Sequence, residues 1–392
     1  MQKVQTGLEN LIHNPPAGLE KKRLALLCNP ASVDSRFQHA RDLIDRRFPG
    51  AMKTLFSPQH GFFAEKQDNM VESDDLTDDR LSVPVFSLYG ATRTPTETML
   101  EQFDVLIVDL QDVGTRVYTF FTTLSYCMEA AAKTGKSVLI ADRPNPVGGV
   151  QVAGNCLNPE YASFVGRYPI PMRHGLTIGE YASYINQAFE IGCDLSVIPM
   201  KGWKRGMYFD DTGLAWIAPS PNLPTPASVQ VYPGQVIWEG TNISEGRGTA
   251  LPFELFGAPF LETDAVRQAL GGTSISGAVL RPAVFEPTSG KWAQTPCSGF
   301  QIHVTDRYQF EPYTTSLKLL STVLARHPDE LAWKTPPYEY EWEKLPFDLI
   351  TGDPEIRRQL RAGADVAEMA RAWQPEVQKY LREVRRFYLY EE

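Results

Sequence analysis

The sequence is poor in the features that mark disulfide scaffolds, zinc domains and membrane proteins. Its five cysteines are odd in number and widely spaced, and no CxxC pair occurs, so we expect neither a disulfide framework nor a zinc site. No window approaches the ~18 uninterrupted apolar residues of a membrane span. The first residues lack an apolar signal-peptide core, which favours a cytoplasmic protein. A secreted chain trimmed of its signal peptide would look the same.

Positive charge and nucleotide-binding motifs are also scarce. The net charge of −9 gives no electrostatic footprint for nucleic acid or for an anionic membrane. No GxGxxG follows an expected strand, and GxxxxGK[ST], GxSxG and HExxH are absent. We therefore expect no nucleotide cofactor, no metal and no serine-hydrolase site. A small-molecule substrate fits this composition best.

The first part of the chain contains alternating strand and helix patterns. Short apolar runs that suit buried parallel strands occupy residues 24–28, 52–56, 105–108 and 137–141. Helical periodicity fills 38–48 and 119–133. This alternation predicts an α/β fold with a doubly wound parallel sheet over residues 1–150, ending near Gly148-Gly149. Residues 151–392 are expected to form a smaller α+β domain.

Polar residues gather directly after these expected strands. The candidates are Gln59 and His60 after 52–56, Asp109 and Gln111 after 105–108, and Arg143 and Asn145 after 137–141. Open α/β sheets bind ligands outside the carboxyl ends of their strands, so these side chains should converge on one crevice. Around Asp109, an internal salt bridge to a nearby arginine is an equally good interpretation.

Carboxylates occur in two loops that are candidates for chemistry. The loop 56–79 is long for a compact domain, as lids and binding loops are, and it contains Glu65. Glu239 and Glu245 lie in a second, glycine-punctuated loop. Paired carboxylates are the usual tools of glycoside hydrolysis, one as acid and the other as nucleophile or base. Alternatively, one of them forms a salt bridge with Arg247.

Five further residues complete the candidate site: Arg116, Tyr118, His174, Asn222 and Asn242. His174 precedes an expected helix, in which Thr177 and Glu180 match a capping box. A histidine there is an acid/base or sugar-binding group, or else a structural residue.

Several long stretches, in collinear order, resemble the bacterial exo-β-N-acetylmuramidases, formerly a domain of unknown function. They are FSPQHGFF, VPVFSLYG, DVLIVDLQDVGTRVYTF, IADRPNPVGG, YPIPMRHGLTIGEYA, IGCDLSVIPMKGW, SPNLPTP, EGTNISEGRGTALPFELFGAP and, more weakly, LPFDLITGDPEIRRQL. The resemblance implies a Rossmann-like N-terminal domain, a smaller C-terminal domain and an active cleft between them. It implies release of terminal N-acetylmuramic acid from peptidoglycan fragments, without metal or cofactor.

One position departs from the family pattern. The resemblance implies a loop motif S/G-P-E-H-G whose glutamate is the catalytic acid, and Gln59 occupies that position here. An amide cannot donate and recover a proton as a carboxylic acid does. Three interpretations follow. Glu65 takes over the role of the acid; the protein acts on a different sugar or by a different mechanism; or the protein binds a sugar without hydrolysing it. His60 is retained.

The resulting hypothesis is a glycosidase acting on an amino sugar or muropeptide. Glu65 or Glu245 would protonate the leaving oxygen, and the remaining candidates would bind the sugar, with an arginine such as Arg116 or Arg143 pairing with the lactyl carboxylate. Two other classes stay open: a non-catalytic muropeptide-binding protein, and an amidase or deacetylase, which a dependence on metal would indicate.

Overall fold

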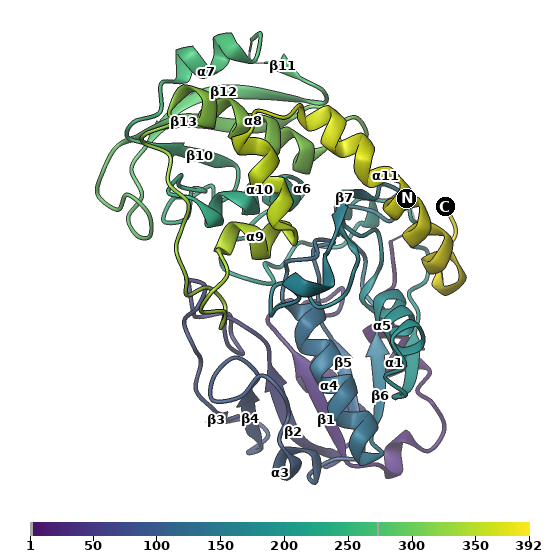
Figure 1. Cartoon of the computed structure of the whole chain (residues 1–392). Coiled ribbons are helices and arrows are strands. Elements are labelled where there is room, and N and C mark those ends of the chain that lie inside the picture. The colour runs from purple at the N-terminus through teal and green to yellow at the C-terminus, as the bar shows by residue number, and fades with distance from the viewer. Residues whose placement is uncertain (1–2, 273) are drawn as a thin grey trace.

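A seven-stranded sheet forms the core of the N-terminal part in the computed structural model, which describes residues 3–272 and 274–392 (Figure 1). The strand order is β3-β4-β2-β1-β5-β6-β9, and β3 alone runs antiparallel to its neighbour among these described strands. The strands are β1 (Leu24–Cys28), β2 (Met52–Ser57), β3 (Leu76–Thr77), β4 (Pro84–Ser87), β5 (Val105–Asp109), β6 (Ser137–Ala141) and β9 (Asp194–Ile198). The predicted parallel α/β fold is confirmed.

Helices cover both faces of this sheet, which explains why its strands are almost entirely apolar. Ala25 and Leu27 of β1 share a core with α4 and α5, whereas Leu24 and Leu26 share the opposite core with α1 and α2. A strand buried on both faces needs apolar side chains at every position. The helices are α1 (Gly7–His13), α2 (Ala40–Arg47), α3 (Glu97–Leu100), α4 (Phe120–Thr134) and α5 (Ile178–Ala188).

The large sheet continues past the boundary expected after residue 150. β9 pairs in parallel with β6 and is covered by α5. The sequence of β9, DLSVI, is only partly buried because it is an edge strand, so it lacks the continuous apolar pattern of the other strands. The helix α5 begins with the predicted capping box, in which Thr177 accepts from the Glu180 amide and Glu180 accepts from the Thr177 amide.

A smaller, antiparallel sheet forms the core of the C-terminal part, in the order β10-β13-β12-β11. Its strands are β10 (Leu255–Ala258), β11 (Ser274–Ile275), β12 (Ala278–Phe285) and β13 (Cys297–Val304). The helices of this part are α6 (Pro226–Gln235), α7 (Thr263–Ala269), α8 (Pro312–Arg326), α9 (Pro346–Thr351), α10 (Pro354–Arg361) and α11 (Val366–Val384). A short 3-10 helix, η4 (Val236–Gly240), follows α6, and the hairpin β7 (Ala153–Cys156) and β8 (Pro171–Arg173) lies between the two parts.

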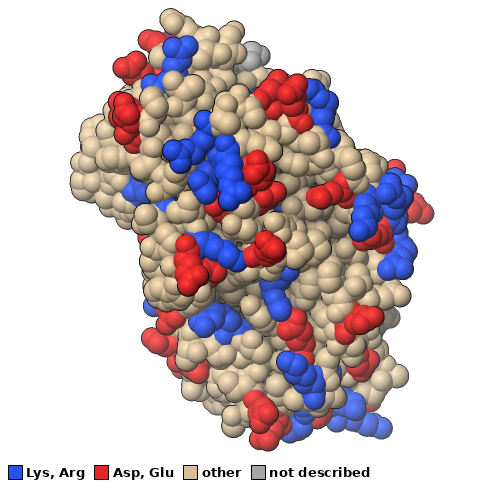
Figure 2. All heavy atoms as spheres, in the orientation of Figure 1, with Lys and Arg blue, Asp and Glu red and all other residues tan. Residues whose placement is uncertain are grey.

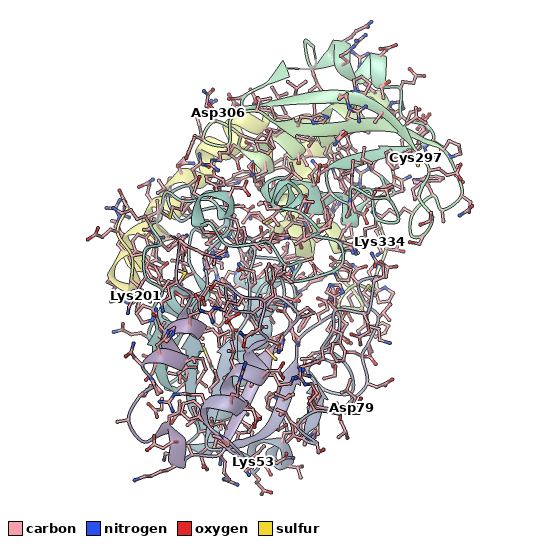
Figure 3. The ribbon with its side chains drawn as sticks, turned by 180° about the vertical axis from the view of Figure 1, so that it is seen from behind. Lys53, Asp79, Lys201, Cys297, Asp306 and Lys334 are labelled. Carbon is pink, nitrogen blue, oxygen red and sulfur yellow. The ribbon has the colours of Figure 1, made fainter. Side chains whose placement is uncertain are left out.

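Two connections matter for the site. The segment between α8 and α9, yellow-green in Figure 1, descends from the C-terminal part to lie against the N-terminal part. Lys334, at the start of this descent, is labelled in Figure 3 where the two parts meet. The turn between β5 and α4 rises toward the same level.

Charges of both signs are mixed on the surface. On the face drawn in Figure 2, Lys and Arg lie interspersed with Asp and Glu over both parts. Within residues 3–272 and 274–392, no helix combines the length and the apolar character that a bilayer crossing requires.

Candidate active site

A polar cavity lies where the carboxyl end of β2 and the start of α4 meet the C-terminal part. Its empty space, including the part open to solvent, is about 490 Å³. The carboxyl, amide, imidazole and guanidinium side chains that line it are Gln59, His60, Asn69, Asn222, Glu239, Arg247 and Glu339. These groups come from loops at the carboxyl edge of the large sheet and from the C-terminal part, as the expected cleft between the two domains requires.

Gln59 and Glu339 form the centre of one wall. The Gln59 Nε2 donates to Glu339 Oε1 at 3.0 Å, and the Thr119 hydroxyl donates to Gln59 Oε1 at 2.7 Å. Tyr89 donates its hydroxyl to Glu339 Oε2 at 2.6 Å. The two partners of this amide–carboxyl pair are 280 positions apart in the sequence. The pair therefore exists only because the α8–α9 segment descends onto the large sheet.

The Glu339 carboxyl is poised to exchange a proton near neutral pH. Burial raises the pKa of Glu339 to about 7, although the hydrogen bonds from Tyr89 and Gln59 favour its ionised form. No arginine or lysine forms an ion pair with it among the described residues. A carboxylic acid with a pKa in this range can donate a proton at neutral pH and recover it afterwards.

Glu239, in η4, is the ionised carboxylate of the cavity. Burial alone would raise the pKa of Glu239, but the charge and the hydrogen bond of Arg247 outweigh it and hold this pKa below its ordinary value. Arg247 Nη2 donates to Oε1 at 2.7 Å, while Tyr338 and Asn69 donate to Oε2 at 2.7 and 3.1 Å. One cavity thus holds two carboxyl groups whose pKa values are driven apart, as in acid–base pairs of glycosidases.

His60 faces the cavity as a neutral ring. Burial lowers the pKa of His60 to about 4, and the Arg247 charge acts in the same direction. Its Nδ1 lies 2.8 Å from the Lys66 carbonyl, which can only accept, so Nδ1 carries the hydrogen and Nε2 is left as an acceptor.

The backbone is strained on both sides of the Gln59–Glu339 contact. His60 has a φ of 78° and Glu339 a φ of 46°, in the left-handed region that non-glycine residues rarely adopt. Such conformations cost about 1–3 kcal/mol each and cluster at functional sites.

The cavity contains several residues that the sequence singled out. Besides Gln59, His60, Glu239 and Arg247, it is lined by Tyr118 and Asn222. Asn222 exchanges hydrogen bonds with Gln67, donating to its carbonyl at 2.7 Å and accepting from its side chain at 3.3 Å. This contact fixes part of the long loop after β2 against the C-terminal part.

A second group of predicted residues lies at a separate cavity near the ends of β1, β5 and β6. Arg143 pairs with Asp109 through two contacts of 2.5 and 2.8 Å, and Gln111 donates to the Asp112 and Pro144 carbonyls. Arg143 and Gln111 line this second cavity together with Trp216. The polar strand ends thus divide between two cavities instead of one crevice, because the ion pair with Asp109 and the bonds of Gln111 to backbone carbonyls hold these side chains at the second cavity.

Three predicted residues are engaged in holding the backbone. Arg116 donates to the carbonyls of Asn155, Ile170, Ile350 and Thr351, and it has no carboxylate partner among the described residues. Asn145 donates to the Leu176 carbonyl and caps its own turn by accepting from the Val147 amide. His174 is fully buried against Phe121, and its Nδ1 accepts from the Leu176 amide. None of the three lines the polar cavity.

The other predicted carboxylates and Asn242 also lie outside the cavity lining. Glu65 is exposed and accepts from the Phe63 amide at 3.1 Å. Glu245 pairs with Lys291 at 2.8 Å and with Arg247 at 3.3 Å. Asn242 bonds to the backbone of Glu330 and Ala332.

Sequence reasoning missed Glu339 and Tyr338, which lie in the run Tyr338-Glu339-Tyr340. A carboxylate between two aromatic side chains was the available signal, since such a group is buried and its pKa rises. Glu339 does not belong to any sequence motif that would have identified it.

Comparison with known proteins identifies the family. A family model described as the N-terminal region of the exo-β-N-acetylmuramidase NamZ matches residues 24–227, and the model of its C-terminal region matches residues 230–390. The chain belongs to the NamZ family. The two models meet at the start of α6, after the last strand of the large sheet.

Members of the NamZ family that resemble this chain include a curated enzyme and solved structures. The peptidoglycan β-N-acetylmuramidase NamZ of Bacillus subtilis (strain 168) is 41% identical over 388 residues, which are 99% of this chain and 92% of the relative. Two crystal structures of DUF1343 family proteins from Bacteroides fragilis NCTC 9343 superpose with TM-scores of 0.88 and 0.77 at 32% and 28% identity. The first match covers 99% of both chains and the second 100% of both.

Proposed function

We propose that the protein is an exo-β-N-acetylmuramidase that releases terminal N-acetylmuramic acid from peptidoglycan fragments, with Glu339 as its general acid. Membership of the NamZ family supports the substrate class. The observation that carries the choice of acid is the buried Glu339 carboxyl, with a pKa raised to about 7, in direct contact with Gln59. The amide at Gln59 then acts as a positioning residue for the acid.

In this mechanism Glu339 gives its proton to the glycosidic oxygen as the bond to the anomeric carbon breaks. Positive charge develops on the sugar ring, and the ionised Glu239 stabilises it. Water then adds to the anomeric carbon, and the proton that it releases restores Glu339. The net change is the addition of one water across the glycosidic bond.

Glu239 suits the electrostatic role because three donors hold its charge in place. Arg247, Tyr338 and Asn69 fix both of its oxygens before substrate binds, so little reorganisation is needed when charge develops. The neutral His60, with Nε2 as an acceptor, suits a hydrogen bond from a sugar hydroxyl.

The test compares two leaving groups. A sugar alkoxide must be protonated to leave, whereas 4-nitrophenolate leaves unaided. We expect Glu339→Gln to lower kcat/KM about 10²–10⁴-fold for the disaccharide of N-acetylmuramic acid and N-acetylglucosamine, and less than about tenfold for 4-nitrophenyl β-N-acetylmuramide. Equal losses on both substrates would contradict the role of Glu339 as an acid.

A matched control is Glu254→Gln, since Glu254 is also a buried carboxylate but lies outside the cavity lining, against Thr225 and Gln301. We expect nearly full activity from this variant on both substrates. Binding of the disaccharide without turnover by the wild type would instead favour a non-catalytic muropeptide-binding protein.

A further inference from the structure

The N-terminus of α4 is directed at the polar cavity without a cap. The helix has 15 residues, no acidic side chain in its first turn and no side-chain cap. Its N-cap residue, Thr119, uses its hydroxyl on Gln59 instead. The first amides of a helix have no partner inside the helix, and they carry partial positive charge. Val117, Tyr118, Thr119 and Phe120 all line the cavity.

Two further donors of the same cavity lack partners. Tyr118 is 6% exposed, and its buried hydroxyl forms no hydrogen bond of standard geometry among the described residues, although the neighbouring Ser220 side chain opposes the rise in its pKa. Burial raises the pKa of Tyr118, so the hydroxyl keeps its proton and remains a donor. Arg247 binds Glu239 through Nη2, while its buried Nη1 is likewise without a partner in the described chain.

A donor buried without a partner destabilises the free protein, and this cost is recovered when a ligand supplies an acceptor. A helix N-terminus, a neutral hydroxyl and a guanidinium N–H are all donors, so the matching ligand group is an anion. The charges of Arg247 and Lys291 balance those of Glu239 and Glu245. The protonated Glu339 adds no charge of its own, so an incoming carboxylate meets no uncompensated negative charge.

We infer that the start of α4, the Tyr118 hydroxyl and Arg247 Nη1 bind the carboxylate of the lactyl ether of N-acetylmuramic acid. This inference rests on the proposed function and assigns the group that distinguishes the substrate from N-acetylglucosamine. Arg116 and Arg143 are then not the residues that bind the carboxylate. Arg116 donates to four backbone carbonyls, and Arg143 is paired with Asp109. Recognition of this group is what makes the enzyme specific for a muramide.

The experiment measures binding of three free sugars by calorimetry: N-acetylmuramic acid, its lactyl amide and N-acetylglucosamine. The amide keeps the size of the lactyl ether and removes its charge. The variants are Tyr118→Phe, which deletes only the hydroxyl, and the control Tyr168→Phe, whose hydroxyl contacts Glu129 outside the cavity lining. Hydrolysis of 4-nitrophenyl β-N-acetylmuramide is measured in parallel.

We expect the wild type to bind the acid more tightly than the amide and N-acetylglucosamine. Tyr118→Phe should raise the Kd of the acid about tenfold or more, the effect of losing a hydrogen bond to a charged group. It should change the other two Kd values less than about twofold, and Tyr168→Phe should change none.

An equal loss for the acid and the amide, or no loss for either, would overturn the inference. A wild type that hydrolyses the muramide but binds the acid no more tightly than the amide would overturn it too, while leaving the proposed function intact. A wild type without turnover contradicts the proposed function instead, and the three Kd values still decide whether the anion site exists.

Discussion

Arg116 should be a determinant of stability and not of substrate binding. Its guanidinium is 2% exposed and donates to four carbonyls at 2.7 to 3.3 Å, two of which belong to the last residues of α9. It therefore joins the turn before α4 to the hairpin β7–β8 and to the C-terminal part. Arg116→Met keeps an unbranched apolar stem, shortens the side chain and removes all four hydrogen bonds.

At about 1 kcal/mol for each bond, Arg116→Met should lower the free energy of unfolding by about 4 kcal/mol. Removal of a buried cation offsets part of this loss of stability. The four carbonyls left without a hydrogen-bond donor increase the loss. The assay is urea unfolding followed by tryptophan fluorescence. Arg371→Met is the control, since Arg371 forms an exposed ion pair with Glu368 at 3.6 Å and should contribute less than about 1 kcal/mol.

Substrate affinity distinguishes the two roles of Arg116. Where Arg116→Met remains folded, its KM for a muramide should equal that of the wild type. A KM raised tenfold with unchanged stability would contradict the structural role of Arg116 and assign carboxylate binding to it.

Two more variants test residues that the sequence proposed. Glu65→Gln should change kcat/KM less than about twofold, because Glu65 is exposed and outside the cavity lining; a loss of orders of magnitude in a hydrolysis assay would make Glu65 the acid. Arg143→Met leaves Asp109 buried without its ion partner, so it should cost about 3–5 kcal/mol of stability in urea unfolding. In the folded variant, affinities for N-acetylmuramic acid and for its neutral amide should change equally, and a selective loss of the acid would assign carboxylate recognition to Arg143.

The fold was largely predictable because local patterns encode it. β1, β2, β5 and β6 are apolar on both faces, and their order along the chain with α2 and α4 specifies a parallel sheet. The pattern of continuous apolar residues did not predict β9, because an edge strand is less buried and needs fewer apolar residues.

The candidate site was predicted in part, because some of its contacts are not local. Gln59, His60 and Tyr118 adjoin elements of the large sheet, so their position at its carboxyl edge followed from topology. Glu339 reaches Gln59 from 280 positions away, and no periodicity encodes such a contact. The same limit applies to Arg116, whose partners in α9 are 234 and 235 positions away. Its charge suggested a substrate anion, whereas its contacts are with backbone carbonyls.

The pH dependence of kcat/KM for the disaccharide of N-acetylmuramic acid and N-acetylglucosamine shows whether Glu339 is the general acid. Glu339 must be protonated to act, and its pKa is raised to about 7, so the active form is lost as the pH rises through that value. We expect kcat/KM to fall about tenfold per pH unit above about pH 7, and we expect no such fall in the residual activity of Glu339→Gln. A kcat/KM that stays level from about pH 6 to about pH 9, or the same fall in Glu339→Gln, would contradict the role of Glu339 as the general acid.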